Sequence, residues 1–189
     1  MVMKDGMLPD RQSLRMKWFD YSSAGVYFVT ICTSKGKLVF GNIEDGRMYL
    51  NDAGRIAQEQ WLVLPERFFG IALDQFVIMP NHIHGIVVIY TNTVVEHMPE
   101  RFQPYMQALA EERNHVLKEP YSPPTLGKIM RTYKAATSRL VRTAGVPDFA
   151  WQANYDDRII RDPTYLENVR RYILENPQRW KKEVYEIEP

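Results

Sequence analysis

The sequence predicts an α+β fold of the ferredoxin-like type, in which helices pack on an antiparallel sheet. Extended apolar segments rich in Val, Ile and Phe indicate the strands, and helical segments between and after them indicate the packing layers. The chain of 189 residues, 45% hydrophobic and 25% charged, has the length and composition of one soluble domain. We therefore expect a single domain over residues 1–189.

Strands and turns dominate the first half of the chain. β-branched and aromatic residues predict a strand over Val26–Thr33. A short hairpin is expected around Asp45-Gly46, with residues 38–40 and 47–50 as its strands. Two further strands are expected over about Phe69–Met79 and Ile83–Tyr90.

Capping residues and prolines mark the helices. Asn51 or Asp52 can cap a helix that runs to about Leu64 and ends at Pro65. A second helix is expected from Thr125 to Arg142, followed by a short strand near Arg158–Ile160. The final helix should begin at Asp162-Pro163 and stop at Asn176, just before Pro177.

Two segments fall outside this pattern. Residues 1–21 are polar, basic and aromatic, and we interpret them as an arm leading into the fold. Residues 91–124 contain five prolines and a mixed helical patch near Met106–Leu117, and we interpret them as a variable insertion.

The bulk properties limit the functional classes only weakly. A net charge of +1 means that any affinity for nucleic acid must come from local basic patches. A single cysteine, Cys32, cannot form an internal disulfide and is expected to be a small core residue in a reducing compartment. No apolar run is long enough to span a membrane, so a cytoplasmic location is the default expectation.

A His-x-His pair is the main candidate for chemistry. His82 and His84 lie in a strongly apolar strand, and alternate strand residues share a face, so both imidazoles should point the same way, roughly 6–7 Å apart at the backbone. Such a pair can share one divalent metal ion. The alternative is two polar residues on a half-exposed strand face, but buried imidazoles need partners and a metal supplies them.

The terminal helix can supply the second half of a site. Helical periodicity puts Tyr165, Val169, Tyr172 and Asn176 on one narrow stripe, beside a core-facing side formed by Leu166, Val169 and Ile173. By helix geometry alone, Tyr172 is a tyrosine at the edge of the core and Asn176 is a helix end.

Several motifs together resemble the REP-associated tyrosine transposases, which are relatives of the single-strand transposases of small bacterial insertion sequences in the HUH nuclease superfamily. The resemblance covers about residues 11–180 except 91–124. It rests first on the segments Met79-Pro80-Asn81-His82-Ile83-His84-Gly85-Ile86-Val87 and Val169-Arg170-Arg171-Tyr172-Ile173-Leu174-Glu175-Asn176-Pro177. Supporting matches are Tyr21-Ser22, Gly25–Thr33, Trp61, Leu64–Phe68, Lys134, Trp151–Tyr155 and Ile159–Asp162.

The resemblance implies a role for each motif residue. His82 and His84 would bind a catalytic divalent metal ion, Mg²⁺ or Mn²⁺, with Asn176 as a third ligand, and Tyr172 would be the nucleophile. A phenolate that attacks phosphorus forms a 5′-phosphotyrosine and releases a 3′-hydroxyl, so the strand can be resealed without ATP. The metal would hold the scissile phosphate and neutralise its growing charge. From ligand type alone, zinc also fits.

Basic residues supply candidate DNA contacts. On the 125–142 helix the basic residues face away from the apolar side, and no acidic residue lies among them, which favours phosphate binding over a merely solvated face. The candidate DNA-binding residues are Lys128, Arg131, Lys134, Arg139, Arg142 and, on the final helix, Arg171. The resemblance implies single-stranded or hairpin DNA as the partner, and it allows a homodimer that shares its sites.

Three functions are consistent with these features. The first is a metal-dependent single-strand DNA endonuclease and strand-transferase that acts through Tyr172. The second is a non-catalytic nucleic-acid-binding module of the same fold. The third is a hydrolase in which His82 and His84 activate water and Tyr172 is structural.

Overall fold

Four antiparallel strands form the central sheet, in the order β4-β5-β1-β6. The computed structural model describes residues 24–90 and 122–180; the predicted arm and residues 91–121 of the predicted insertion lie outside this range. The strands of this sheet are β1 (Gly25–Cys32), β4 (Ile71–Ile78), β5 (His82–Ile89) and β6 (Asp156–Ile160). Each lies within two residues of its predicted position, a shift typical of strand ends.

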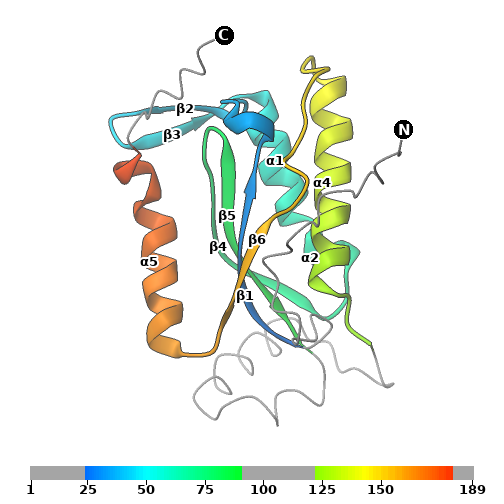
Figure 1. Cartoon of the computed structure of the whole chain (residues 1–189), viewed down its shortest axis with the longest axis vertical. Coiled ribbons are helices and arrows are strands. Elements are labelled where there is room, and N and C mark those ends of the chain that lie inside the picture. The colour runs from blue at the N-terminus through cyan, green and yellow to red at the C-terminus, as the bar shows by residue number, and fades with distance from the viewer. Residues whose placement is uncertain (1–23, 91–121, 181–189) are drawn as a thin grey trace, which may run out of the picture.

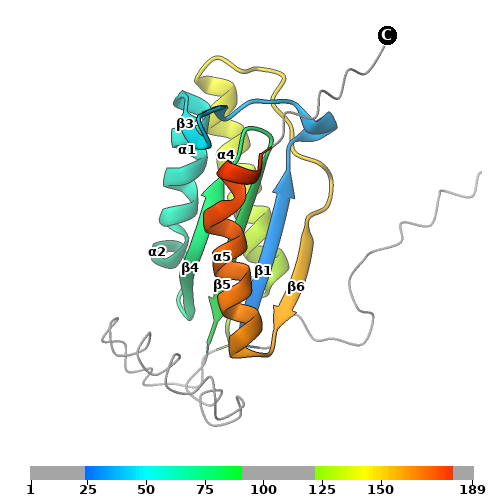
Figure 2. The same cartoon turned by 90° about the vertical axis from the view of Figure 1, so that its left-hand side faces the viewer.

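Helices cover both faces of this sheet (Figures 1 and 2). One face packs against α1 (Asp52–Leu62), α2 (Leu64–Arg67) and α4 (Leu126–Thr143). The other face packs against α5 (Pro163–Arg179). Without α5 and the small hairpin, the order β1-α1-β4-β5-α4-β6 is the ferredoxin-like arrangement, which confirms the predicted fold class.

The sheet separates two apolar cores. On the α1 and α4 side, Trp61 and Tyr133 are fully buried against strand residues such as Ile31. On the α5 side the helix contributes Leu166, Val169 and Ile173, the three residues predicted to face the core. In α4 the buried face includes Thr137 and Val141, whereas Ala136 and Leu140 are half-buried.

The predicted first strand of the hairpin is placed a few residues too early. The structure pairs β2 (Gly41–Glu44) with β3 (Arg47–Leu50) around the expected turn. Residues 38–40 are not a strand, because the backbone amides of Val39 and Phe40 both donate to the carbonyl of Pro80 instead. A 3₁₀ turn (Ser34–Gly36) precedes them.

Helix starts agree with the sequence, but two helix ends differ. Of the two predicted capping candidates, Asn51 caps α1, since its side chain accepts from the amide of Gly54. That helix ends at Leu62 and not at Leu64, and Pro65 occupies the first turn of α2, where its missing N–H is not needed.

The final helix continues past its predicted end at Asn176. Helix α5 includes Pro177 and ends at Arg179. A proline in the last turn removes one backbone donor, the N–H that would pair with Ile173, and leaves the remaining turn able to form. The amide of Trp180 still donates to the carbonyl of Pro177. Within the described residues, no helix has the length and apolar character needed to cross a bilayer.

Candidate active site

The two histidines of β5 share one face of the sheet, as predicted. The ring centroids of His82 and His84 are 4.5 Å apart, and both rings lie on the side covered by α5. Ile83 between them is fully buried in the opposite core. Strand alternation therefore directs both imidazoles toward the terminal helix.

Each imidazole has its Nδ1 atom held by a neighbouring side-chain oxygen. The hydroxyl of Thr30 is 2.8 Å from Nδ1 of His84, and Oδ1 of Asn81 is 2.6 Å from Nδ1 of His82. An amide oxygen only accepts, so Nδ1 of His82 carries the proton and Nε2 keeps its lone pair. Contacts of this kind fix the tautomer and orientation of metal-binding histidines.

Burial keeps both rings neutral. The side chain of His84 is 6% exposed, and burial lowers its pKa from 6.5 to about 3, with a further lowering by the neighbouring His82 ring. Burial also lowers the pKa of His82 to about 4, and a hydrogen bond with Asn176 opposes that shift. Neutral imidazoles are the form that can donate a lone pair to a metal ion.

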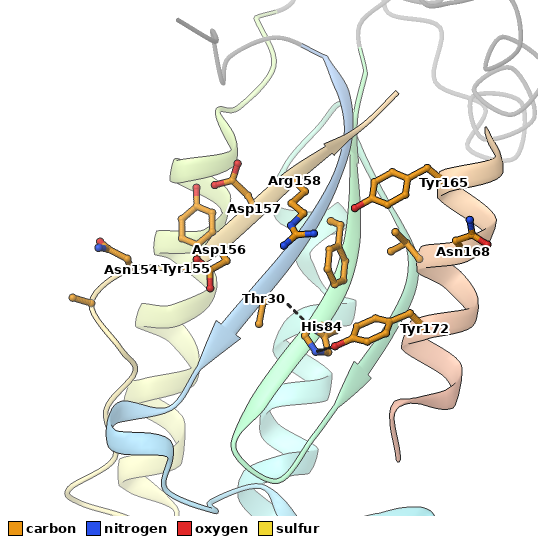
Figure 3. A pocket seen from close by; sticks show the side chains of 13 residues that line it. Thr30, His84, Asn154, Tyr155, Asp156, Asp157, Arg158, Tyr165, Asn168 and Tyr172 are labelled. Carbon is orange, nitrogen blue, oxygen red and sulfur yellow. Dashed lines mark hydrogen bonds between the residues drawn. The ribbon is translucent and has the colours of Figure 1, made fainter. Parts of the chain in front are cut away.

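Tyr172 lies directly over His84 (Figure 3). Its hydroxyl is 3.3 Å from Nε2 of His84, and the ring centroids are 5.2 Å apart. Phe28 of β1 stacks on the His84 ring and meets the Tyr172 ring edge-on. Tyr172 is 40% exposed.

Asn176 lies one turn further along α5, where its side chain is close enough to His82 to raise the pKa of that imidazole. The ring of Trp180 lies 5.9 Å from the His82 ring and covers that end of the site. The chain thus brings together the two histidines, the tyrosine and the asparagine that were selected from the sequence.

The donor set fits a divalent metal ion. Both rings present Nε2 away from their Nδ1 contacts, and Asn176 adds an amide next to His82. In the part of the chain that the structure describes, no group of three His, Cys, Asp or Glu side chains could hold an ion. A metal at this site would therefore use two imidazoles and an amide, a neutral set that leaves the charge of the ion undiminished.

A groove of about 920 Å³ opens beside the tyrosine, between α5 and β6 (Figure 3). Its floor is formed by Phe28, Thr30 and His84. Its walls come from two segments: Ala153, Asn154, Tyr155, Asp156, Asp157 and Arg158 on the β6 side, and Tyr165, Asn168, Val169 and Tyr172 on α5. The groove leads from the His84–Tyr172 contact to the edge strand.

The predicted DNA-binding residues lie on different faces of the molecule. Helix α4, which carries five of them, is on the opposite side of the sheet from α5 (Figure 2). Lys128, Arg131 and Arg139 are exposed. Arg142 is also exposed, although its Nε donates to the carbonyl of Phe149. Arg171 is exposed on α5, where it donates to Asn168.

Lys134 differs from the other cations of α4. Its ammonium donates to the backbone carbonyls of Gln152, Ala153 and Asn154, at 2.5, 3.2 and 3.2 Å. The indole of Trp151 donates in return to the carbonyl of Lys134, at 3.2 Å. These bonds hold the loop that forms one wall of the groove.

Sequence reasoning did not find the residues that support the two imidazoles. Thr30, Asn81 and Phe28 have no unusual spacing, and none of them suggests chemistry alone. One signal was nevertheless present, because Asn81 directly precedes His82. Thr30 is directly opposite His84 in the β1–β5 register, which only the structure shows. Cys32 is a free cysteine and is only half-buried, so it is not the small core residue that was expected.

Comparison with known proteins finds one relative in sequence and a similar fold among solved structures. No protein-family model matches the chain. An uncharacterized protein of Haemophilus influenzae is 34% identical over 173 residues, which cover 92% of this chain and 91% of that protein. A REP-associated tyrosine transposase, solved bound to a REP hairpin, has a similar fold with a TM-score of 0.54 and 13% identity, over 89% of this chain and 77% of that one.

Proposed function

We propose that this chain, which belongs to the same protein family as the uncharacterized Haemophilus influenzae protein, is a metal-dependent single-strand DNA endonuclease and strand-transferase. One observation carries the proposal: the Tyr172 hydroxyl is 3.3 Å from Nε2 of His84, and the Nδ1 atoms of both histidines are held by side-chain oxygens. A nucleophile candidate thus meets a pair of neutral ligands at the end of an open groove. The fold shared with a REP-associated tyrosine transposase supports the same assignment.

In the proposed reaction, Tyr172 is the nucleophile. Its oxygen forms a bond to the scissile phosphorus and its proton passes to water, while the bond from phosphorus to the 3′ oxygen breaks and that oxygen takes up a proton. Attack by a free 3′-hydroxyl on the phosphotyrosine reverses the step and joins the strand to a new end. A divalent ion bound by His82, His84 and Asn176 would neutralise the charge that grows on the phosphate oxygens.

Phe28 and Thr30 keep the reacting groups in place. Phe28 packs against both the His84 ring and the Tyr172 ring, which restricts how each can turn. The Thr30 hydroxyl holds Nδ1 of His84, the ring nitrogen that does not face Tyr172. Since positioning accounts for much of the rate in phosphoryl transfer, these contacts favour a preorganised site.

We further propose hairpin or single-stranded DNA as the substrate. The groove beside Tyr172, with a volume of about 920 Å³, would receive the strand. The exposed cations of α4 would contact phosphates of the same DNA, which then has to pass around the β6 edge, because α4 and α5 lie on opposite faces. Mg²⁺ and Mn²⁺ both suit a neutral nitrogen and oxygen set that the phosphate completes.

A covalent-trapping experiment tests the proposal. End-labelled hairpin DNA with a single-stranded flank is incubated with Mn²⁺ and wild type, Tyr172→Phe or Tyr49→Phe, and the products are run on a denaturing gel. Tyr49 is an exposed tyrosine on β3 and serves as the matched control. We expect a protease-sensitive shifted band for wild type and Tyr49→Phe, and none for Tyr172→Phe or in EDTA.

Other outcomes distinguish the alternative functions. Cleavage that persists in Tyr172→Phe without an adduct would indicate a hydrolase in which the histidines activate water. Hairpin binding by wild type with no cleavage and no adduct would indicate a non-catalytic binding module. Full activity after the combined change His82→Ala and His84→Ala would contradict the metal assignment.

A further inference from the structure

Apolar packing alone does not fix the rotation of α5 about its own axis. The helix rests on the sheet through Leu166, Val169 and Ile173, which are all buried. Apolar contact is non-directional, so a stripe of three residues tolerates small rolls of the helix. Tyr172 stands beside this stripe and not within it, and its position over His84 therefore depends on the roll angle.

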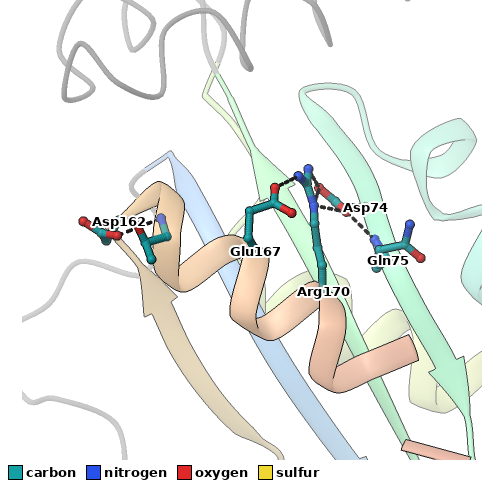
Figure 4. Close-up of polar contacts among 6 residues, drawn as sticks. Asp74, Gln75, Asp162, Glu167 and Arg170 are labelled. Carbon is teal, nitrogen blue, oxygen red and sulfur yellow. Dashed lines mark hydrogen bonds and ion pairs between the residues drawn. The ribbon is translucent and has the colours of Figure 1, made fainter. Parts of the chain in front are cut away.

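A second anchor joins α5 to the sheet on the other side of the stripe. The guanidinium of Arg170 binds the carboxylate of Asp74 on β4 through Nε, at 3.0 and 3.1 Å, and through Nη2, at 2.5 Å (Figure 4). The Asp74 side chain is only 7% exposed and that of Arg170 is 24% exposed. Forked contacts of this kind fix geometry as well as contributing energy.

A bulge in β4 places the carboxylate under the helix. The register of β4 against β5 shifts between Leu73 and Phe76, which puts an extra residue into β4. Asp74 lies in this irregular part, and its Oδ1 also accepts from the amide of Gln75, at 2.6 Å. The carboxylate is thus held by the strand itself, so that Arg170 binds a fixed point of the sheet.

Arg170 and Tyr172 lie on opposite sides of the apolar stripe. At 100° per residue, Arg170 is roughly 70° and Tyr172 roughly 90° from the centre of the stripe. A tyrosine oxygen is about 8 Å from the helix axis, since the Cα radius is about 2.3 Å, so a roll of about 10° moves the oxygen by about 1.4 Å. That movement is a large part of the 3.3 Å separation between the Tyr172 hydroxyl and Nε2 of His84.

We propose that the Asp74–Arg170 ion pair sets the roll of α5 and thereby positions the Tyr172 hydroxyl over His84. Both are positioning residues, because neither touches the His84–Tyr172 contact itself. The consequence for catalysis rests on the proposed function. The structural effect does not, since the Tyr172–His84 contact exists whatever the protein catalyses.

The test reads that contact directly. The ¹⁵N chemical shift of His84 Nε2 is measured in the metal-free protein for wild type, Tyr172→Phe, Arg170→Met, Arg170→Lys and Glu167→Gln. Glu167 also binds the Arg170 guanidinium, but its side chain is 67% exposed. Glu167→Gln removes this exposed contact and keeps the Asp74–Arg170 pair, so it is the matched control. We expect Arg170→Met to shift the resonance in the direction of Tyr172→Phe, Arg170→Lys to shift it less, and Glu167→Gln to match wild type.

Two results would overturn the proposal. One is a folded Arg170→Met protein with the wild-type Nε2 shift, and the other is an equal shift in Glu167→Gln. If Arg170→Met fails to fold, Arg170→Lys, which keeps the charge and loses the fork, and the isosteric Asp74→Asn decide the same question.

A kinetic arm separates positioning from general loss of structure. Under single-turnover conditions we expect Arg170→Lys to form the covalent adduct about 10- to 100-fold more slowly, a size typical of displacement by about 1 Å. The Mn²⁺ affinity should fall less than it does in the combined variant His82→Ala and His84→Ala, because both histidines are on β5 and only Asn176, the third proposed ligand, moves with α5. If wild type forms no adduct, the proposed function fails while the NMR arm still decides the role of the ion pair.

Discussion

Thr30 and His84 lie directly opposite each other on adjacent antiparallel strands, and the threonine hydroxyl is 2.8 Å from Nδ1 of the imidazole. The other nitrogen, Nε2, faces Tyr172. Both ring nitrogens therefore have a defined partner, and the ring is held in one orientation. The strand register that forms the sheet also selects which nitrogen is presented to the groove.

From this contact we predict that Thr30→Val weakens metal binding by about 10- to 100-fold, the usual effect of losing a partner that orients a metal-binding histidine. Valine matches threonine in shape but cannot hold Nδ1. Thr30→Ser keeps the hydroxyl and should bind nearly as tightly as wild type. Isothermal titration with Mn²⁺ measures both affinities, and equal binding by Thr30→Val and wild type would contradict the assignment.

The buried histidines predict a loss of stability in mild acid for the metal-free protein. The pKa of His82 is lowered to about 4 and that of His84 to about 3, whereas an unfolded chain has values near 6.5. Above pH 6.5 both states are neutral and the histidines contribute no pH dependence. Below pH 6.5 the unfolded chain takes up protons that the folded protein does not. The free energy of unfolding therefore decreases as the pH is lowered.

For His84 alone this loss is about 2 kcal/mol at about pH 5, from the difference between the two pKa values. Urea unfolding in EDTA between about pH 7.5 and pH 5 measures it. Carboxylates also begin to titrate in this range, so the comparison is with the double variant His82→Gln and His84→Gln. The double variant should lose less stability over the same interval; a parallel loss would exclude buried neutral histidines.

A glycine behind the site allows close packing of the opposite core. A Cβ atom on Gly85 would be 2.4 Å from Cζ2 of Trp61, which is fully buried. We predict that Gly85→Ala destabilises the protein by about 1–3 kcal/mol through overpacking. Adding Trp61→Phe, which frees space at that point, should restore part of the loss, and thermal unfolding of the four proteins in the cycle measures the coupling. Strict additivity would contradict the direct clash.

The sequence was sufficient for the fold because its periodic signals and caps agree with the tertiary structure. Asn51, Thr125 and Asp162 each cap the helix that they were expected to begin. The errors occur where a long-range contact decides the outcome. Val39 and Phe40 have the composition of a strand, but they bond to Pro80, a partner that local pattern cannot reveal.

The residues of the candidate site also form two groups: those that could be identified from the sequence and those that could not. His82 and His84 could be selected from their spacing on a strand, and Tyr172 and Asn176 from the family resemblance; the structure brings the four together. Thr30 and Phe28 could not, because their contribution depends on the pairing of β1 with β5. The Asp74–Arg170 pair depends on a bulge that leaves no pattern in the sequence.

Lys134 provides a test of how the basic helix binds DNA. Its ammonium is engaged by three backbone carbonyls, and burial lowers its pKa. Arg131, three residues earlier, is exposed on the same helix. We predict that Arg131→Met reduces the salt dependence of DNA binding by about one phosphate contact, whereas Lys134→Met leaves this slope unchanged.

Lys134→Met should act on the loop instead. Three carbonyls would lose their donor, so we expect lower thermal stability and faster hydrogen exchange or proteolysis at residues 152–154, while Arg131→Met has wild-type values. Because Ala153 and Asn154 line the groove, DNA affinity should fall for Lys134→Met at every salt concentration by the same factor. If Lys134→Met instead reduces the salt dependence of DNA binding and leaves the loop intact, Lys134 contacts a DNA phosphate.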